Sequence, residues 1–172
     1  MKKLFILVFI FATLNCFAQK VISGSFALPE SEAYLYVDWD FSETLFEKKY
    51  NEKEWEAMNA GEWTKAKSEA LAFILNEMNE NLKKSRITVI QKGSDLKAEY
   101  TLYISAIKLD RKGNNKSFYI LKKNDSGEEI GKAQINGDGG HWGSLGNLLG
   151  DGYEEAARKM GSLIKKNNKL NK

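Results

Sequence analysis

A short stretch of the chain holds all three residue types that a serine hydrolase uses. Asp138, His141 and Ser144 follow one another in a glycine-rich segment. In such an enzyme a base accepts the proton of the serine, an acid orients the base, and backbone N–H groups stabilise the oxyanion. Triads are, however, assembled from distant segments on rigid elements, and this stretch has no G-x-S-x-G turn. We therefore favour a polar surface loop, and a secreted hydrolase that uses His141 is the alternative.

The same segment offers two kinds of ion binding. A glycine-rich turn ahead of a helix can bind phosphate, but no Lys or Arg lies between Gly137 and Gly152, and Asp138 and Asp151 would repel an anion. Asn136 adds an oxygen donor for calcium, yet the spacing matches neither an EF-hand nor a repeated calcium-binding pattern. We therefore predict no metal site and no cofactor.

A pair of carboxylates, Asp38 and Asp40, lies on a segment with alternating polarity. Residues two apart on a strand point to the same face, roughly 6–7 Å from each other. The acid and base of a glycosidase can have such a separation. We favour a solvated sheet face, flanked by Tyr34 and Tyr36, because a D-x-D pair is common on half-exposed strands.

Two tryptophans, Trp55 and Trp142, do not fall on an apolar face in the pattern. Trp142 lies beside Gly140 and Gly143, and tryptophan is enriched at binding hot spots. The alternative is that its ring packs the loop onto the sheet. We expect the segment 137–152 to contact a partner or a surface through Trp142, His141, Asp138 and Asp151, and we count Trp55 as a further binding residue.

Composition excludes several classes of protein. The chain has 172 residues, of which 42% are hydrophobic, which is enough to form the core of one domain. One cysteine and one histidine exclude a disulfide framework, a cysteine-rich zinc site and a multi-histidine metal site. The net charge of +3 is spread without a basic block, so we expect no nucleic-acid partner.

The N-terminus is typical of a secretory signal peptide. A basic start at residues 1–3 precedes an apolar run over 4–14, which is shorter than the roughly 20 residues of a membrane span. Small residues predict cleavage after Ala18, and hence a periplasmic or extracellular location. Cys16 allows an alternative, in which a lipoprotein peptidase cuts before it and the lipidated chain associates with a membrane. Asn15 occupies a position where that peptidase usually meets a small residue.

The remaining chain alternates strand and helix patterns, with no internal repeat. Period-two alternation or β-branched runs predict strands, three- and four-residue apolar spacing predicts helices, and Asn124 to Gly127 predicts a hairpin turn. The expected strands are 34–41, 87–90, 98–109, 117–122 and 128–135, and the expected helices are 63–84 and 151–166, with a shorter one around 52–58.

This order predicts an α+β fold. Each long helix has a single apolar stripe, so both should pack on one face of one sheet. We expect a two-layer sandwich, with a mixed, mostly antiparallel sheet of about five strands and two amphipathic helices on one face. The domains would then be a signal peptide at 1–18, a single domain at 19–166 and a polar tail at 167–172.

The element order and the phrase AEYTLYISAI at 98–107 are similar to small envelope-associated proteins of Gram-negative bacteria. The architecture resembles the N-terminal domain of TolB, the penicillin-binding-protein activator LpoB and the curli-secretion CsgG group. The residues around the expected cleavage site, Phe17-Ala18-Gln19, resemble those of signal peptides of Bacteroidota. This resemblance implies an accessory or assembly role, and it assigns no functional residue.

Together these observations predict a non-catalytic, exported, envelope-associated accessory or binding protein, whose partner is another envelope protein. Besides the hydrolase, a small-ligand carrier is a third possibility. Its sign would be an apolar cavity between sheet and helices that Phe41, Phe73 and Met78 leave unfilled.

Overall fold

The computed structural model describes residues 19–28 and 33–170. The expected signal peptide, including Cys16, and the last two residues of the expected tail lie outside the described residues. In chain order the elements are β1 (Gln19–Gly24), β2 (Ala33–Asp40), β3 (Leu45–Phe46), α1 (Glu52–Met58), α2 (Glu62–Leu82), a 3-10 turn (Lys83–Ser85), β4 (Ile87–Gln91), β5 (Tyr100–Leu109), β6 (Asn115–Lys123), β7 (Glu129–Gly137) and α3 (Leu145–Leu170).

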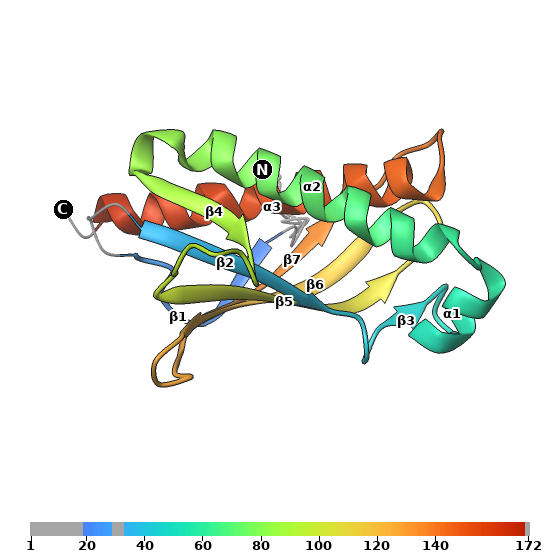
Figure 1. Cartoon of the computed structure of the whole chain (residues 1–172), viewed down its shortest axis with the longest axis horizontal. Helices are drawn as coiled ribbons and strands as arrows, with labels where there is room; N and C mark the ends of the chain where they lie inside the picture. The colour runs from blue at the N-terminus through green and yellow to red at the C-terminus, as the bar shows by residue number, and fades with distance from the viewer. Residues whose placement is uncertain (1–18, 29–32, 171–172) are drawn as a thin grey trace, which may run out of the picture.

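The fold is α+β, as predicted, with one mixed sheet in the order β1-β7-β6-β5-β2-β4 and β3 beside β5. Strand β2 pairs in parallel with β4 and β5, and β3 also pairs in parallel with β5. The pairs β1–β7, β5–β6 and β6–β7 are antiparallel. Both long helices, α2 and α3, lie on one side of this sheet (Figure 1).

The expected number of strands was too low: the described residues form a sheet of seven strands rather than about five. Besides the two long helices of the expected sandwich there is a third α-helix, α1, over the residues 52–58 where a shorter helix was expected. Strand β1 escaped prediction because it lies at the sheet edge, where Val21 and Ile22 are 44% and 48% exposed and no polarity pattern is needed. Helix α1 begins with a capping box formed by Asn51 and Glu54.

Helix α3 begins at Leu145, whereas the sequence pattern predicted a start near 151, and it continues through residues expected in the tail. Glycine is unfavourable inside helices, so Gly146 and Gly150 predicted a loop. In the structure they allow α3 to approach α2 closely: a Cβ on Gly150 would lie 2.5 Å from the ring of Phe73. The two helices run in the same direction, since Gly146 meets Glu69 and Gly161 meets Asn81, further along α2.

Between the helices and the sheet lies a core rich in aromatic rings. The alternation of β2 buries Leu35 and Val37, as predicted, and α2 buries its apolar stripe. Trp63 contacts Phe41 and Phe46 in edge-on geometry, with ring centroids 5.1 and 5.2 Å apart. This cluster joins the start of α2 to the far end of β2.

At the sheet edge formed by β4, a side chain binds the exposed backbone. The amide of Asn79 on α2 accepts from the backbone N–H of Val89 at 2.8 Å and donates to its carbonyl at 2.9 Å. Asn79 therefore takes the place of a neighbouring strand beside β4, which protects that edge against pairing with another chain.

Candidate binding site

The loop 138–144, which joins β7 to α3, is held at both ends. Its first residues are bound to neighbouring elements: the N–H of Gly139 donates to the Asn114 side chain at 2.9 Å, and the N–H of Asp138 donates to the Glu155 carboxylate. At the other end Ser144 begins α3, since its side chain accepts from the N–H of Asn147 at 3.3 Å. The loop stands at the end of the molecule where α3 starts (Figure 1).

Close backbone packing explains much of the glycine content of this segment. A Cβ on Gly137 would lie 1.8 Å from the carbonyl oxygen of Gly152, and a Cβ on Gly139 would lie 1.8 Å from that of Lys112. Real Cβ atoms do not approach oxygen so closely, so the strand end, the β5–β6 turn and α3 meet here only through glycine. The glycines thus support packing, without any need for a bound phosphate or oxyanion.

The three hydrolase candidates are not assembled into a triad. Asp138, His141 and Ser144 are all exposed. Among the described residues, no hydrogen bond joins the side chains of these three, and the Ser144 oxygen caps a helix. A triad needs a base in contact with both nucleophile and acid. The structure brings the three residues into one loop but not into that arrangement.

The calcium candidates are likewise spread out. Asp138 and Asp151 are exposed, and the carboxylate of Asp151 lies against Gly140. The described part of the chain contains no group of three or more His, Cys, Asp or Glu side chains that could hold a metal ion.

The tryptophans differ sharply in exposure. Trp142 is 91% exposed at the tip of the loop, whereas Trp55 is fully buried. The expectation that Trp55 lies off the core was wrong: α1 presents it to Phe46, on which it stacks with ring centroids 5.3 Å apart. A short helix carries too few residues to show this apolar face in the sequence. The buried ring of Trp55 has no surface to offer to a partner.

The carboxylate pair lies on the sheet face opposite the helices, and each acid has its own partner. Asp38 forms an ion pair with Lys92 at 2.7 Å. Asp40 accepts from the N–H and hydroxyl of Ser42 and, at 2.8 Å, from the hydroxyl of Tyr103. These hydrogen bonds, chiefly the one from the Ser42 N–H, lower the pKa of Asp40 despite its partial burial. Burial, followed by the bond to Asp40, raises the pKa of Tyr103 to about 12.

We predict that Asp40→Asn lowers the pKa of Tyr103 from about 12 but leaves it above the ordinary 10.0, because burial is the larger cause. Ultraviolet titration of the phenolate absorbance measures the pKa of Tyr103, as the difference between the curves of Asp40→Asn and Asp40→Asn/Tyr103→Phe. Since the unfolded chain ionises this tyrosine first, stability should also fall as pH rises from 10.0 towards 12. An unchanged Tyr103 titration in Asp40→Asn would contradict the hydrogen bond.

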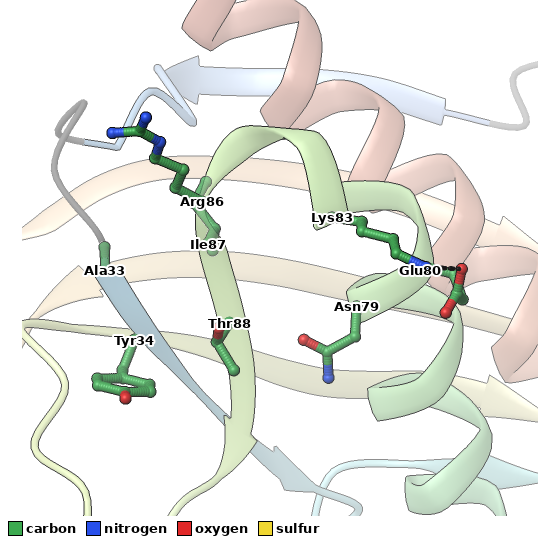
Figure 2. Close-up of a pocket in the computed structure, with 8 residues that line it drawn as sticks. All are labelled: Ala33, Tyr34, Asn79, Glu80, Lys83, Arg86, Ile87 and Thr88. Atoms are coloured by element: carbon green, nitrogen blue, oxygen red, sulfur yellow. Dashed lines mark ion pairs between the residues drawn. The ribbon is translucent and has the colours of Figure 1, made fainter.

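Two clefts bear on the carrier hypothesis. One, of about 580 Å³, lies between the end of α2 and strands β2 and β4, where Lys83 pairs with Glu80 and the side chain of Arg86 extends away from the other lining residues (Figure 2). The other, of about 560 Å³, lies beside Trp39 and α2. Phe41, which lines this second cleft, and Met78 are 3% and 0% exposed, and Phe73 is half-buried.

The molecule is thus a two-layer α+β protein with an anchored, exposed loop. Within the part of the chain that the structure describes, no helix has the length and apolarity needed to cross a membrane. No protein-family model and no curated protein matches the chain.

Solved structures similar to the chain include two of the PelC dodecamer from Paraburkholderia phytofirmans, at 14% and 15% identity. In both, the match covers 85% of this chain and 95% of that chain, with a TM-score of 0.44. A candidate lipoprotein from Caulobacter crescentus is 17% identical over 56% of this chain and 82% of that chain, with a TM-score of 0.35. These likenesses assign no residue of this chain, and the resemblance to TolB, LpoB and CsgG stays a prediction.

Several features that position the loop could not be seen in the sequence. Asn114 and Glu155 hold its start, yet each is distant in the chain. The only local signal was the pair Asn114-Asn115 after Gly113, which indicates a turn. The sequence of this turn does not say which loop residue it contacts, because that depends on how β5, β6 and α3 pack together.

Proposed function

We propose that this chain is an exported, envelope-associated accessory protein that binds a partner protein through the loop 138–144. The observation that carries the proposal is Trp142, 91% exposed on a loop whose two ends are anchored. Export rests on the pattern of residues 1–18, which lie outside the described residues.

The energetics support a contact role for this side chain. Burying a tryptophan removes about 150–250 Å² from water, worth about 4–6 kcal/mol at roughly 25 cal/mol per Å². In the free protein Trp142 gains almost none of this. Because the anchored loop is already ordered, binding would lose less conformational entropy than ordering a free loop would. His141 and Asp138 add polar groups beside the indole, as at the rim of a protein interface.

A photocrosslinking amino acid in place of Trp142 tests the proposal in the cells that export the protein. We expect one defined adduct from position 142 and none from position 58, where Met58 is 46% exposed on α1. Trp142→Ala should abolish co-purification of the adduct's protein, and Trp142→Phe should retain part of it. A folded Trp142→Ala variant that binds this protein as well as wild type would overturn the proposal.

A further inference from the structure

The sheet face opposite the helices carries a set of lysines. Along β6 and β7, buried residues alternate with half-buried ones such as Ile120 and Gln134. The buried residues face α2 and α3, so the half-buried residues point away from these helices. By strand register the same face carries the basic face, which we define as Lys20, Lys108, Lys116, Lys122 and Lys132: Lys20 lies opposite Gln134, Lys132 opposite Ile120, and Lys108 opposite Lys116.

The charge of this face is not neutralised within the described residues. None of the five lysines takes part in an ion pair there. Lys108 and Lys116 lie directly opposite each other, a like-charge pair that destabilises a sheet. Glu129 stands opposite Lys122. On the same face Asp38 is paired with Lys92, and Asp40 is hydrogen-bonded to Ser42 and Tyr103. An anion from outside would relieve the repulsion.

Apolar surface lies under these charges. The ammonium of Lys122 is 5.2 Å from the ring centroid of Tyr103, and that of Lys132 is 4.6 Å from the ring centroid of Phe118. Ile120 lies between them in register. Lysines with stems over apolar groups and heads in water suit a boundary between apolar and aqueous phases.

The neighbouring edge strand extends this surface. Ile22, 48% exposed, stands in the register shift just before Ser23, which lies opposite Lys132. Val21 lies opposite the buried Ala133 and therefore belongs to the helix side of the sheet.

We infer that the basic face, with the neighbouring Ile22, binds the surface of an anionic phospholipid bilayer. The lysines are spread in two dimensions over the sheet face, which suits the flat surface of a bilayer better than a single extended acidic chain. Lys116 and Lys122 are six residues apart, about 20 Å along β6, and the lysines span four strands, about 14 Å across. Attraction of several lysines to anionic headgroups adds up. This inference is independent of the loop 138–144.

The test uses the exported, purified chain in a Cys16→Ser background, so that no lipid anchor contributes. Flotation with phosphatidylglycerol-containing vesicles is compared with flotation with pure phosphatidylcholine vesicles. We expect binding to the anionic vesicles only, with loss of binding at ~1 M salt, where the Debye length is about 3 Å. The variant Lys116→Glu/Lys122→Glu/Lys132→Glu should need at least about tenfold more anionic lipid for half-maximal flotation.

A second triple variant, Lys53→Glu/Lys84→Glu/Lys166→Glu, changes the net charge equally at exposed positions on α1, the 3-10 turn and α3 and should bind like wild type. The neutral variant Lys116→Gln/Lys122→Gln/Lys132→Gln, checked by circular dichroism, gives a folded protein with an intermediate loss. Equal binding to both vesicle types would overturn the inference. So would an equal loss in the helix control, or binding to polyglutamate but not to anionic vesicles.

Discussion

Replacing Gly152 by Ala should destabilise the protein by about 3 kcal/mol or more, although alanine is the better helix former by about 1 kcal/mol. A Cβ at this position would lie 2.0 Å from the carbonyl oxygen of Gly113 and 2.9 Å from the side-chain nitrogen of Asn115. The oxygen belongs to the backbone of the β5–β6 turn, so it cannot swing away like a flexible side chain. Helix α3 would have to move off the sheet.

Chemical denaturation measures this loss, with Gly127→Ala as the control. Gly127 has a positive φ of 70° but nothing within 4 Å of the added Cβ, so its substitution costs only backbone strain, of about 1 kcal/mol. For a chain of this size, about 3 kcal/mol corresponds to a Tm lower by roughly 6–12 °C. If Gly152→Ala is as stable as Gly127→Ala, the close approach of α3 to the turn at 110–114 is wrong.

Local periodicity made part of this fold predictable. Apolar and polar residues alternate from Tyr34 to Phe41 because one face of this strand is buried and the other is in contact with solvent. The apolar stripe from Trp63 to Leu82 reflects the one face of α2 that packs against the sheet. Both patterns lie within a single element, so neither requires knowledge of its neighbours. Strand β2 and helix α2 therefore appear close to their expected bounds.

The glycine-rich segment was unpredictable for the opposite reason. Gly146, Gly150 and Gly152 weaken a helix when considered alone, and they are tolerated because Phe73 and the backbone of Gly113 occupy the space that side chains would need. These partners are distant in sequence. The same limit applies to the candidate site. The sequence allowed Trp142 either to be exposed or to pack the loop onto the sheet, and one of the contacts that hold the loop, from Gly139 to Asn114, spans 25 residues of sequence.

The other large effect is expected at Trp63, whose replacement by Ala should cost about 3–5 kcal/mol. Its side chain is fully buried and contacts the rings of Phe41 and Phe46. Its indole N–H also donates to the Glu52 carboxylate at 3.0 Å, which ties α2 to the start of α1. Alanine would leave a cavity where three elements meet, and the rigid sheet beneath cannot collapse to fill it. Urea denaturation of the purified protein gives the free energy of unfolding.

Two further substitutions separate the contributions of packing and hydrogen bonding. Trp63→Phe keeps a ring against Phe41 but loses the N–H donor, and Glu52 still holds Lys67 at 2.8 Å, so we expect a loss of only about 1–2 kcal/mol. Trp142→Ala removes the same side chain from an exposed position and should change stability by less than about 0.5 kcal/mol. A Trp63→Ala loss no larger than that of Trp142→Ala would mean that the aromatic cluster does not join α2 to β2. If Trp142→Ala were the more destabilising of the two, the loop would owe its order to the indole, and the proposed contact role of Trp142 would lose its basis.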